Sequence, residues 1–269
     1  MVRLNYTRFM KNFILNSYSF HQCYRPLNSQ IELTLRCNAR CVFCSIWEKE
    51  FQNELEKDLT LDEIKHIIDG LDQLGVNLIS FTGGEPTLRK DLDEIITYAS
   101  DKGIMTGIAT NGYYVYDLIS KGKLKKLEWV MVSLDWPDAE HHDKYRGIKI
   151  FDRAVKSIKA SVKEKKQVVV SMVVTSENQH LMEKMCQFTR EMGCMIEMLP
   201  CEDLIREQAD SIHVVDNIDS LIPDLKKYAE EIRRLEKIYP NLVTDSITAS
   251  IIEAGGFGNM EFFHCAVAS

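Results

Sequence analysis

The sequence IELTLRCNARCVFC occupies residues 31–44 and joins a short strand-like run to a group of three cysteines. Residues 31–35 predict a first β-strand. Cys37, Cys41 and Cys44 follow with the spacing C-x3-C-x2-C, in the loop that leaves this strand. A loop this short can wrap three thiolates around one small inorganic centre.

The number of cysteines in this loop is informative. Structural zinc sites normally have four protein ligands, whereas a four-iron, four-sulfur cluster held by three cysteines keeps one iron open for an exogenous ligand. The spacing by itself leaves three interpretations open. They are such a cluster, a zinc site completed by Cys23 or a histidine, and buried thiols without a metal.

Beyond this stretch, short apolar runs alternate with longer segments of helical periodicity. The predicted strands are 31–35, 76–81, 104–109, 129–134, 168–174 and 195–199, and the predicted helices are 60–74, 92–102, 117–125, 151–163, 177–192 and 221–238. This alternation predicts a parallel sheet, because each crossover must carry the chain back. The strands are apolar, as expected when both faces of the sheet are covered.

The pattern leaves two architectures open, an open doubly wound sheet and a partial barrel. In both, functional residues are expected at the carboxyl ends of the strands.

Composition and charge argue against a nucleic-acid-binding, membrane-spanning or secreted protein. The chain has 269 residues, 45% of them hydrophobic, and a net charge of −7. An acidic chain is a poor general binder of nucleic acid, so no specific nucleic-acid partner is expected. No apolar run approaches the ~18 residues of a transmembrane segment, and residues 1–20 lack the apolar core of a signal peptide. We therefore expect a cytoplasmic protein, where the eight cysteines stay reduced.

Further motifs stand where the later predicted strands end. Glycines there allow the backbone to approach a ligand closely. Glu85 is an acceptor suited to an ammonium group, and Arg146 offers a bidentate fork for a carboxylate. Each motif also has an ordinary interpretation as a turn or a surface residue. The motifs are Thr82-Gly-Gly-Glu-Pro86, Thr110-Asn-Gly112, Ser133-Leu-Asp135 and His142-Asp-Lys-Tyr-Arg146-Gly147.

In this order, the motifs resemble the radical S-adenosylmethionine (radical SAM) superfamily. The resemblance runs from about Glu32 to Pro200 and includes the aromatic Phe43 before the third cysteine. It is strongest to the subgroup with the molybdenum-cofactor GTP cyclase and the SPASM/twitch enzymes, which carry a C-terminal auxiliary-cluster domain. The resemblance implies an α/β fold, a partial (β/α)6 TIM-like barrel with an N-terminal helix and a short C-terminal extension.

The resemblance also implies an activity. A member of this family is an enzyme that uses a [4Fe-4S] cluster to cleave S-adenosylmethionine to a 5′-deoxyadenosyl radical, which abstracts hydrogen from a substrate. The substrate is left open among peptides, nucleotides and other metabolites, and so is the reaction class. A low-potential electron donor of the flavodoxin or ferredoxin type is implied as a partner. The alternatives are a truncated member and a non-catalytic iron–sulfur or zinc-binding protein.

Position by position, the resemblance implies roles for single residues. Cys37, Cys41 and Cys44 would ligate three irons, and the amino and carboxylate groups of S-adenosylmethionine would chelate the fourth. The implied contacts to S-adenosylmethionine are Gly83, Gly84 and Glu85 at the amino group, Arg146 at the carboxylate, Ser133 at the ribose or methionine part, Phe43 at the adenine and Asn178 at the ribose.

The predicted division of the chain is an N-terminal helical segment (1–29), a radical SAM core barrel (30–215) and a C-terminal helix with a truncated auxiliary-cluster region (216–269). Aromatic residues at helical spacing near the N-terminus favour a helix packed on the barrel over one that touches lipid. Cys265 stands where an auxiliary-cluster domain would open, but the further cysteines of such a domain are absent. We expect a truncated chain, with a remnant as the alternative.

Overall fold

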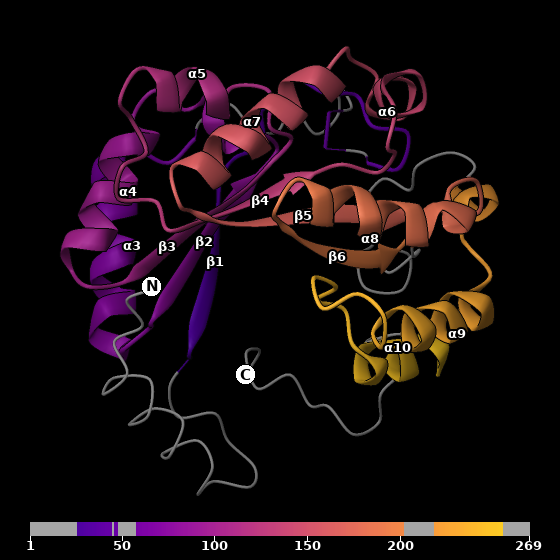
Figure 1. The fold of residues 1–269 in the computed structure, drawn as a ribbon. Helices are drawn as coiled ribbons and strands as arrows, with labels where there is room; N and C mark the ends of the chain where they lie inside the picture. The colour runs from indigo at the N-terminus through magenta and orange to yellow at the C-terminus, as the bar shows by residue number, and fades with distance from the viewer. Residues whose placement is uncertain (1–25, 45, 48–57, 202–217, 255–269) are drawn as a thin grey trace, which may run out of the picture.

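The computed structural model describes residues 26–44, 46–47, 58–201 and 218–254, and Figure 1 shows them as a curved sheet with helices on its outer side. Six parallel strands lie side by side in chain order. This order has no reversal, which excludes a doubly wound sheet and confirms the predicted partial barrel. The strands are β1 (Asn28–Thr34), β2 (Leu78–Gly83), β3 (Met105–Thr110), β4 (Trp129–Ser133), β5 (Gln167–Val174) and β6 (Met195–Pro200).

Helices connect the strands, and two further helices follow the last strand. They are α3 (Leu61–Leu74), α4 (Leu92–Asp101), α5 (Val115–Ser120), α6 (Ala139–Arg146), α7 (Phe151–Lys163), α8 (Met182–Glu191), α9 (Leu225–Leu235) and α10 (Ser246–Glu253), with short 3-10 turns η1 (Pro86–Leu88), η2 (Gln179–Leu181) and η3 (Ile218–Leu221).

Helix α3 illustrates how local sequence sets these elements. The Thr60 hydroxyl accepts a hydrogen bond from the Glu63 amide, and the Glu63 carboxylate accepts one from the Thr60 amide. This capping box satisfies amides that have no partner inside the helix. Ile64 and Ile68 share the inner side of the helix and are buried. The predicted start of this helix is confirmed.

Three predicted helices have clearly different limits in the structure. Helix α5 ends at Ser120 instead of 125, because Gly122 and Leu124 adopt left-handed backbone angles, with φ of 74° and 59°. Helix α8 begins at Met182 instead of 177, after the η2 turn. The helix predicted over 221–238 is the shorter α9, and α10 was missed.

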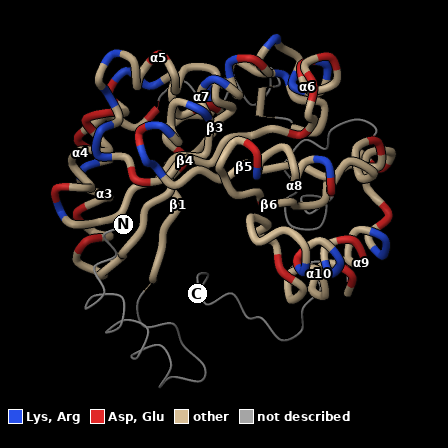
Figure 2. Tube along the Cα trace, in the orientation of Figure 1, with Lys and Arg blue, Asp and Glu red and all other residues tan. Residues whose placement is uncertain are grey.

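The two faces of the sheet differ in burial. In most strands every second residue is buried beneath the outer helices, and Ile79, Phe81 and Val130 are fully buried. The residues between them are half-exposed in most strands. Figure 2 shows charged residues along the outer helices and few on the strands. Among the described residues, the outer face of the sheet is therefore covered more fully than the inner face.

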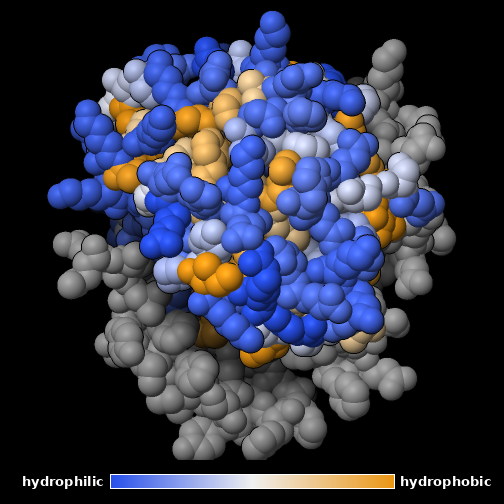
Figure 3. All heavy atoms as spheres, turned by 45° about the vertical axis from the view of Figure 1, so that its right-hand side comes forward, coloured by the Kyte–Doolittle hydropathy of each residue, from blue (hydrophilic) through white to orange (hydrophobic). Residues whose placement is uncertain are grey.

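Helices α9 and α10 pack beside the edge strand β6. The Tyr228 hydroxyl donates to the Met198 carbonyl at 2.7 Å, and the Val243 amide donates to the Ile196 carbonyl at 2.8 Å. The outer surface in Figure 3 is mostly hydrophilic, with separate hydrophobic spots. No described helix is both long and apolar enough to cross a membrane. The predicted N-terminal helix and Cys265 lie outside the described residues, and the division into domains stays a prediction.

Candidate active site at the carboxyl ends of the strands

The loop after β1 carries the three cysteines and is docked onto α6. Cys41 is buried, and Cys37 and Cys44 are half-buried. The Arg40 amide donates to the Arg146 carbonyl at 2.9 Å, and the Val42 amide donates to the Tyr145 carbonyl at 3.0 Å. These bonds join two parts of the chain that lie about a hundred residues apart, as the separation of Cys41 and Arg146 shows. The predicted cysteine loop and the predicted His142–Gly147 stretch therefore meet at one place.

Glycines allow this loop to lie close to its neighbours. A Cβ atom on Gly84 would stand 2.4 Å from the Arg36 carbonyl oxygen, and one on Gly147 would stand 2.6 Å from that of Arg40. The Gly84 amide donates to the Thr34 carbonyl at 2.7 Å. Gly84 and Gly147 thus serve a close backbone approach, which any side chain would prevent.

We expect Gly84→Ala to destabilise the protein by about 1–3 kcal/mol, because the added methyl group overlaps backbone atoms that cannot rotate away. Gly70, inside α3, is the matched control, since a Cβ there meets nothing within 4 Å. Gly70→Ala should stabilise by about 0.5–1 kcal/mol through its helix propensity. Urea unfolding of both variants measures the difference. Equal stability of the two variants would contradict the close approach.

Glu85 is buried beneath the end of β2 and is fully hydrogen-bonded. Its carboxylate accepts from the Thr110 hydroxyl at 2.7 Å, the Asn111 amide at 2.7 Å, the Thr87 amide at 3.0 Å and the Thr87 hydroxyl. Burial raises the pKa of this carboxyl, and the hydrogen bonds oppose that rise. Four acceptor positions are about what a carboxylate has. In the structure Glu85 therefore joins the ends of β2 and β3, and its contact with an amino group stays a prediction.

A buried ion pair lies beneath the cysteine loop. Arg146 donates to Asp135 through Nε at 2.7 Å and through Nη2 at 2.8 Å. Its third nitrogen, Nη1, lies 3.7 Å from the Cys41 sulfur, and its guanidinium lies 5.2 Å from the centre of the Phe43 ring. The Arg146 fork predicted for a ligand carboxylate is therefore occupied by Asp135, while Nη1 faces the cysteine loop. Asp135 was missed as a site residue, although the Ser133-Leu-Asp135 motif contains it.

His142 completes the packing around this pair without adding charge. Its Nδ1 accepts from the Asp135 amide at 3.2 Å, so the proton of the neutral ring is on Nε2. Burial lowers the pKa of His142 to about 4, against the attraction of Asp135. At neutral pH the Arg146 guanidinium is thus the cation that balances Asp135.

Asn178 and Ser133 differ in how free their side chains are. Asn178 donates to the Val173 carbonyl at 2.9 Å and to the Asp135 carbonyl at 3.2 Å, and accepts from the Thr175 amide at 2.6 Å. It therefore fastens the ends of β4 and β5 together. Ser133 is half-buried, and its hydroxyl makes no hydrogen bond to the described residues. The predicted contact of Ser133 with a cofactor would therefore not require any existing hydrogen bond to break.

Ser133 begins a polar row across the inner face of the sheet. Ser133 pairs with Ser171, and Ser171 pairs with Glu197 on β6. Glu197 is half-buried, and burial raises the pKa of its carboxyl. Deeper in the barrel the Trp129 indole covers Gly107, where a Cβ would stand 1.9 Å from the ring. Sequence patterns did not single out Ser171, Glu197 or Trp129, because nothing local tells the inner face from the outer one.

The cysteine sulfurs suit an iron–sulfur cluster in their chemistry. The Ala39 amide donates to the Cys37 sulfur at 3.4 Å, and Arg146 approaches the Cys41 sulfur. Hydrogen bonds of this kind are among the features that tune such clusters. Burial raises the pKa of the Cys37 thiol to about 11, so binding of a metal would release its proton. As they stand, no three His, Cys, Asp or Glu side chains in the described ranges are placed to hold a single ion.

Comparison with known proteins finds a matching family and several relatives of this chain. Residues 31–189 match the family described as the Radical SAM superfamily. The probable GTP 3′,8-cyclase of Pyrococcus horikoshii is 32% identical over 206 residues, which cover 76% of this chain and 65% of that relative. The Fe-coproporphyrin III synthase of Methanosarcina barkeri is 40% identical over 149 residues, which cover 54% and 36%. The chain thus spans less than two thirds of the length of these relatives.

Solved structures with the same fold include SuiB of Streptococcus suis. SuiB bound to S-adenosylmethionine matches 91% of this chain and 52% of its own, with a TM-score of 0.61 and 19% identity. SuiB bound to its precursor peptide SuiA matches with a TM-score of 0.63 and 20% identity, over 93% and 50% of the two chains. At these identities the likeness concerns the fold.

Proposed function

The chain belongs to the radical SAM superfamily, and we propose that Cys37, Cys41 and Cys44 hold the [4Fe-4S] cluster that enzymes of this family use with S-adenosylmethionine. Bound at this loop, the two cofactors supply one-electron cleavage of S-adenosylmethionine and thereby radical chemistry on a substrate. The observation that carries the proposal is the docking of the three-cysteine loop onto α6, at the carboxyl end of β1.

The residues around the loop have three tasks in this proposal. Gly84 and Gly147 let the loop backbone lie close to β2 and α6. Asp135 orients Arg146, whose Nη1 faces the Cys41 sulfur and the side where S-adenosylmethionine would bind. Phe43 packs against the same guanidinium.

Direct contacts to S-adenosylmethionine are proposed at Gly83, Gly84 and Ser133, with Arg146 and Phe43 beside them. Ser133 is half-buried and its hydroxyl makes no hydrogen bond to the described residues, which supports a role at the ribose or methionine part. Glu85 and Asn178 already use their side chains to join strand ends. We therefore propose that these two residues hold the binding surface in shape, and that any contact of theirs requires an exchange of hydrogen bonds.

The substrate is proposed to bind against the inner face of the barrel. Ser171 and Glu197 offer hydrogen-bonding groups in register with Ser133. The described strand residues on this face include Glu32 and Glu197 and no Lys or Arg. This charge favours a substrate that presents hydrogen-bond donors over one that presents a polyanion.

Anaerobic reconstitution with iron and sulfide tests the proposed function. After reduction in the presence of S-adenosylmethionine, we expect formation of 5′-deoxyadenosine and methionine. Ser133→Ala should retain the cluster and bind S-adenosylmethionine several-fold more weakly, because one hydrogen bond is worth about 1 kcal/mol. A protein that assembles no cluster under these conditions would contradict the proposal, and zinc would be tested next.

A further inference from the structure

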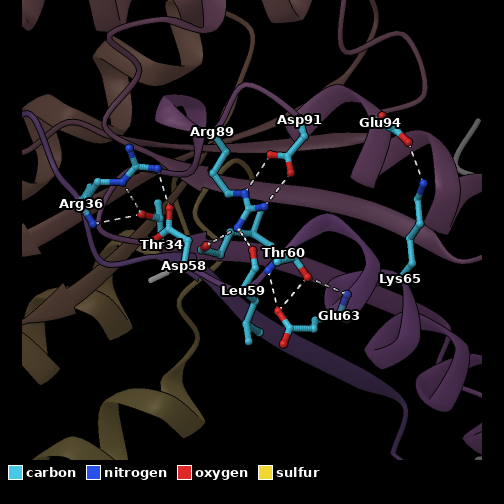
Figure 4. Close-up of polar contacts among 11 residues, drawn as sticks. Thr34, Arg36, Asp58, Leu59, Thr60, Glu63, Lys65, Arg89, Asp91 and Glu94 are labelled. Atoms are coloured by element: carbon cyan, nitrogen blue, oxygen red, sulfur yellow. Dashed lines mark hydrogen bonds and ion pairs between the residues drawn. The ribbon is translucent and has the colours of Figure 1, made fainter. Parts of the chain in front are cut away.

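Arg89 contacts the main chain near the end of β1 and is nearly inaccessible to solvent. Its side chain is 6% exposed, and it follows the η1 turn that begins at Pro86. The Asp91 carboxylate accepts from Arg89 Nε at 2.9 Å and from Nη2 at 2.6 Å. This bidentate pair fixes the plane of the guanidinium and leaves Nη1 directed at the main chain, as Figure 4 shows.

The remaining nitrogen joins two carbonyl groups that are distant in sequence. Arg89 Nη1 donates to the Leu33 carbonyl at 3.0 Å and to the Leu59 carbonyl at 2.8 Å. Leu33 lies at the end of β1, and Leu59 precedes Thr60, the N-cap of α3. The chain between these two carbonyls contains all three cysteines of the loop. One guanidinium therefore holds the two ends of the cysteine segment together.

A second ion pair joins the same two stretches of chain, but its arginine is exposed to solvent. Arg36 Nη2 lies 2.5 Å from Asp58 Oδ2, and the Arg36 side chain is 59% exposed. Figure 4 shows this pair beside the Arg89 contacts, between the same two stretches of chain. An exposed pair contributes little because water and salt screen it. The buried Arg89 contacts are therefore the stronger link.

We propose that Arg89 is a positioning residue that closes the base of the cysteine segment and so keeps Cys37, Cys41 and Cys44 assembled for the cluster. The proposal rests on the proposed function, since it assigns the cluster to these cysteines. Closing a segment of this length costs chain entropy, and a buried guanidinium with two carbonyl partners offsets that cost before any metal arrives. Its contribution is thus to order the ligands, without contact with the cluster itself.

Arg89→Lys tests the proposal. Lysine keeps the charge and can pair with Asp91, but it lacks the planar fork that reaches Asp91 and two carbonyls together. We expect the reconstituted cluster to release iron to a chelator roughly 10–100-fold faster than in the wild type, as for other groups that support metal ligands. Lys65→Gln removes the exposed Lys65–Glu94 pair shown in the same view and is the matched control, with an unchanged rate.

A second readout needs no cluster. The Arg40 and Val42 amides donate hydrogen bonds to α6, which should slow their hydrogen exchange in the metal-free protein. Arg89→Lys should speed their hydrogen exchange, while exchange in the core strands stays as in the wild type. Asp91→Asn, which loosens the guanidinium but leaves both carbonyl bonds, should give an intermediate effect and serves if Arg89→Lys does not fold.

The outcomes separate the two proposals. A wild-type protein that holds no cluster would contradict the proposed function. A wild-type cluster together with iron release and amide exchange in Arg89→Lys equal to those in Lys65→Gln would overturn the role of Arg89 alone.

Discussion

Cys41→Ala is expected to abolish both the cluster and the cleavage of S-adenosylmethionine. Cys41 is buried, and its sulfur lies 3.7 Å from Arg146 Nη1. With three protein ligands proposed, loss of one leaves two thiolates, and alanine offers no replacement. Iron and sulfide analysis after reconstitution should fall to background, and 5′-deoxyadenosine should fall below detection.

The control for this prediction is a cysteine of similar burial away from the loop. Cys186 lies on α8 within the core of the sheet, and burial raises the pKa of its thiol to about 12. Cys186→Ala should keep the full iron content, because a buried protonated thiol behaves as a small apolar group. Full iron content in Cys41→Ala would refute the ligand assignment.

Asp135→Ala is expected to destabilise the fold by about 3–5 kcal/mol, since it leaves the buried Arg146 guanidinium without its counter-charge. The Asp135 side chain is fully buried, and it also accepts a hydrogen bond from the Val173 amide at 3.0 Å. Helix α6 and strand β5 therefore lose a common partner in this variant. Urea unfolding at neutral pH measures the loss.

Two further variants test whether the loss of stability comes from the buried Asp135–Arg146 pair. Asp117→Ala removes a carboxylate paired with Arg153 at the surface, where both side chains are more than a third exposed. Its effect should not exceed about 1 kcal/mol. The double variant Asp135→Ala with Arg146→Met should be more stable than Asp135→Ala alone, because no unpaired charge remains buried. A single variant within 1 kcal/mol of wild type would show that the pair is not a buried ion pair in solution.

The arrangement links stability to the proposed chemistry. Arg146 contacts Asp135 on one side and faces Cys41 and Phe43 on the other. Substitutions at Asp135 should therefore weaken cluster retention as well as the fold. Ser133 differs, since its hydroxyl makes no hydrogen bond to the described residues. Loss of this hydroxyl should affect cofactor affinity alone.

Much of this molecule could be predicted from local sequence. The order of strands and helices follows from hydrophobic periodicity, which is a property of neighbouring residues. The start of α3 follows from the Thr60–Glu63 capping box, and the three cysteines stand within one short loop. The family followed from several such local motifs in a set order. Segment ends were less predictable, as α5 shows, where two left-handed residues end the helix early.

Packing between distant segments determines which partner each polar side chain binds and which face of each strand is buried. Glu85, Arg146 and Asn178 were expected to face a ligand, yet their polar groups bind Thr110, Asp135 and Val173. The hydrogen-bonding capacity of a side chain can be read from sequence, but which partner uses it depends on which strand ends meet at the edge of the sheet. The same holds for the half-buried row of Ser133, Ser171 and Glu197, and for Arg89, which binds the carbonyls at both ends of the cysteine segment. Periodicity marks two faces of a strand, and only the curvature of the whole sheet determines which face the helices cover.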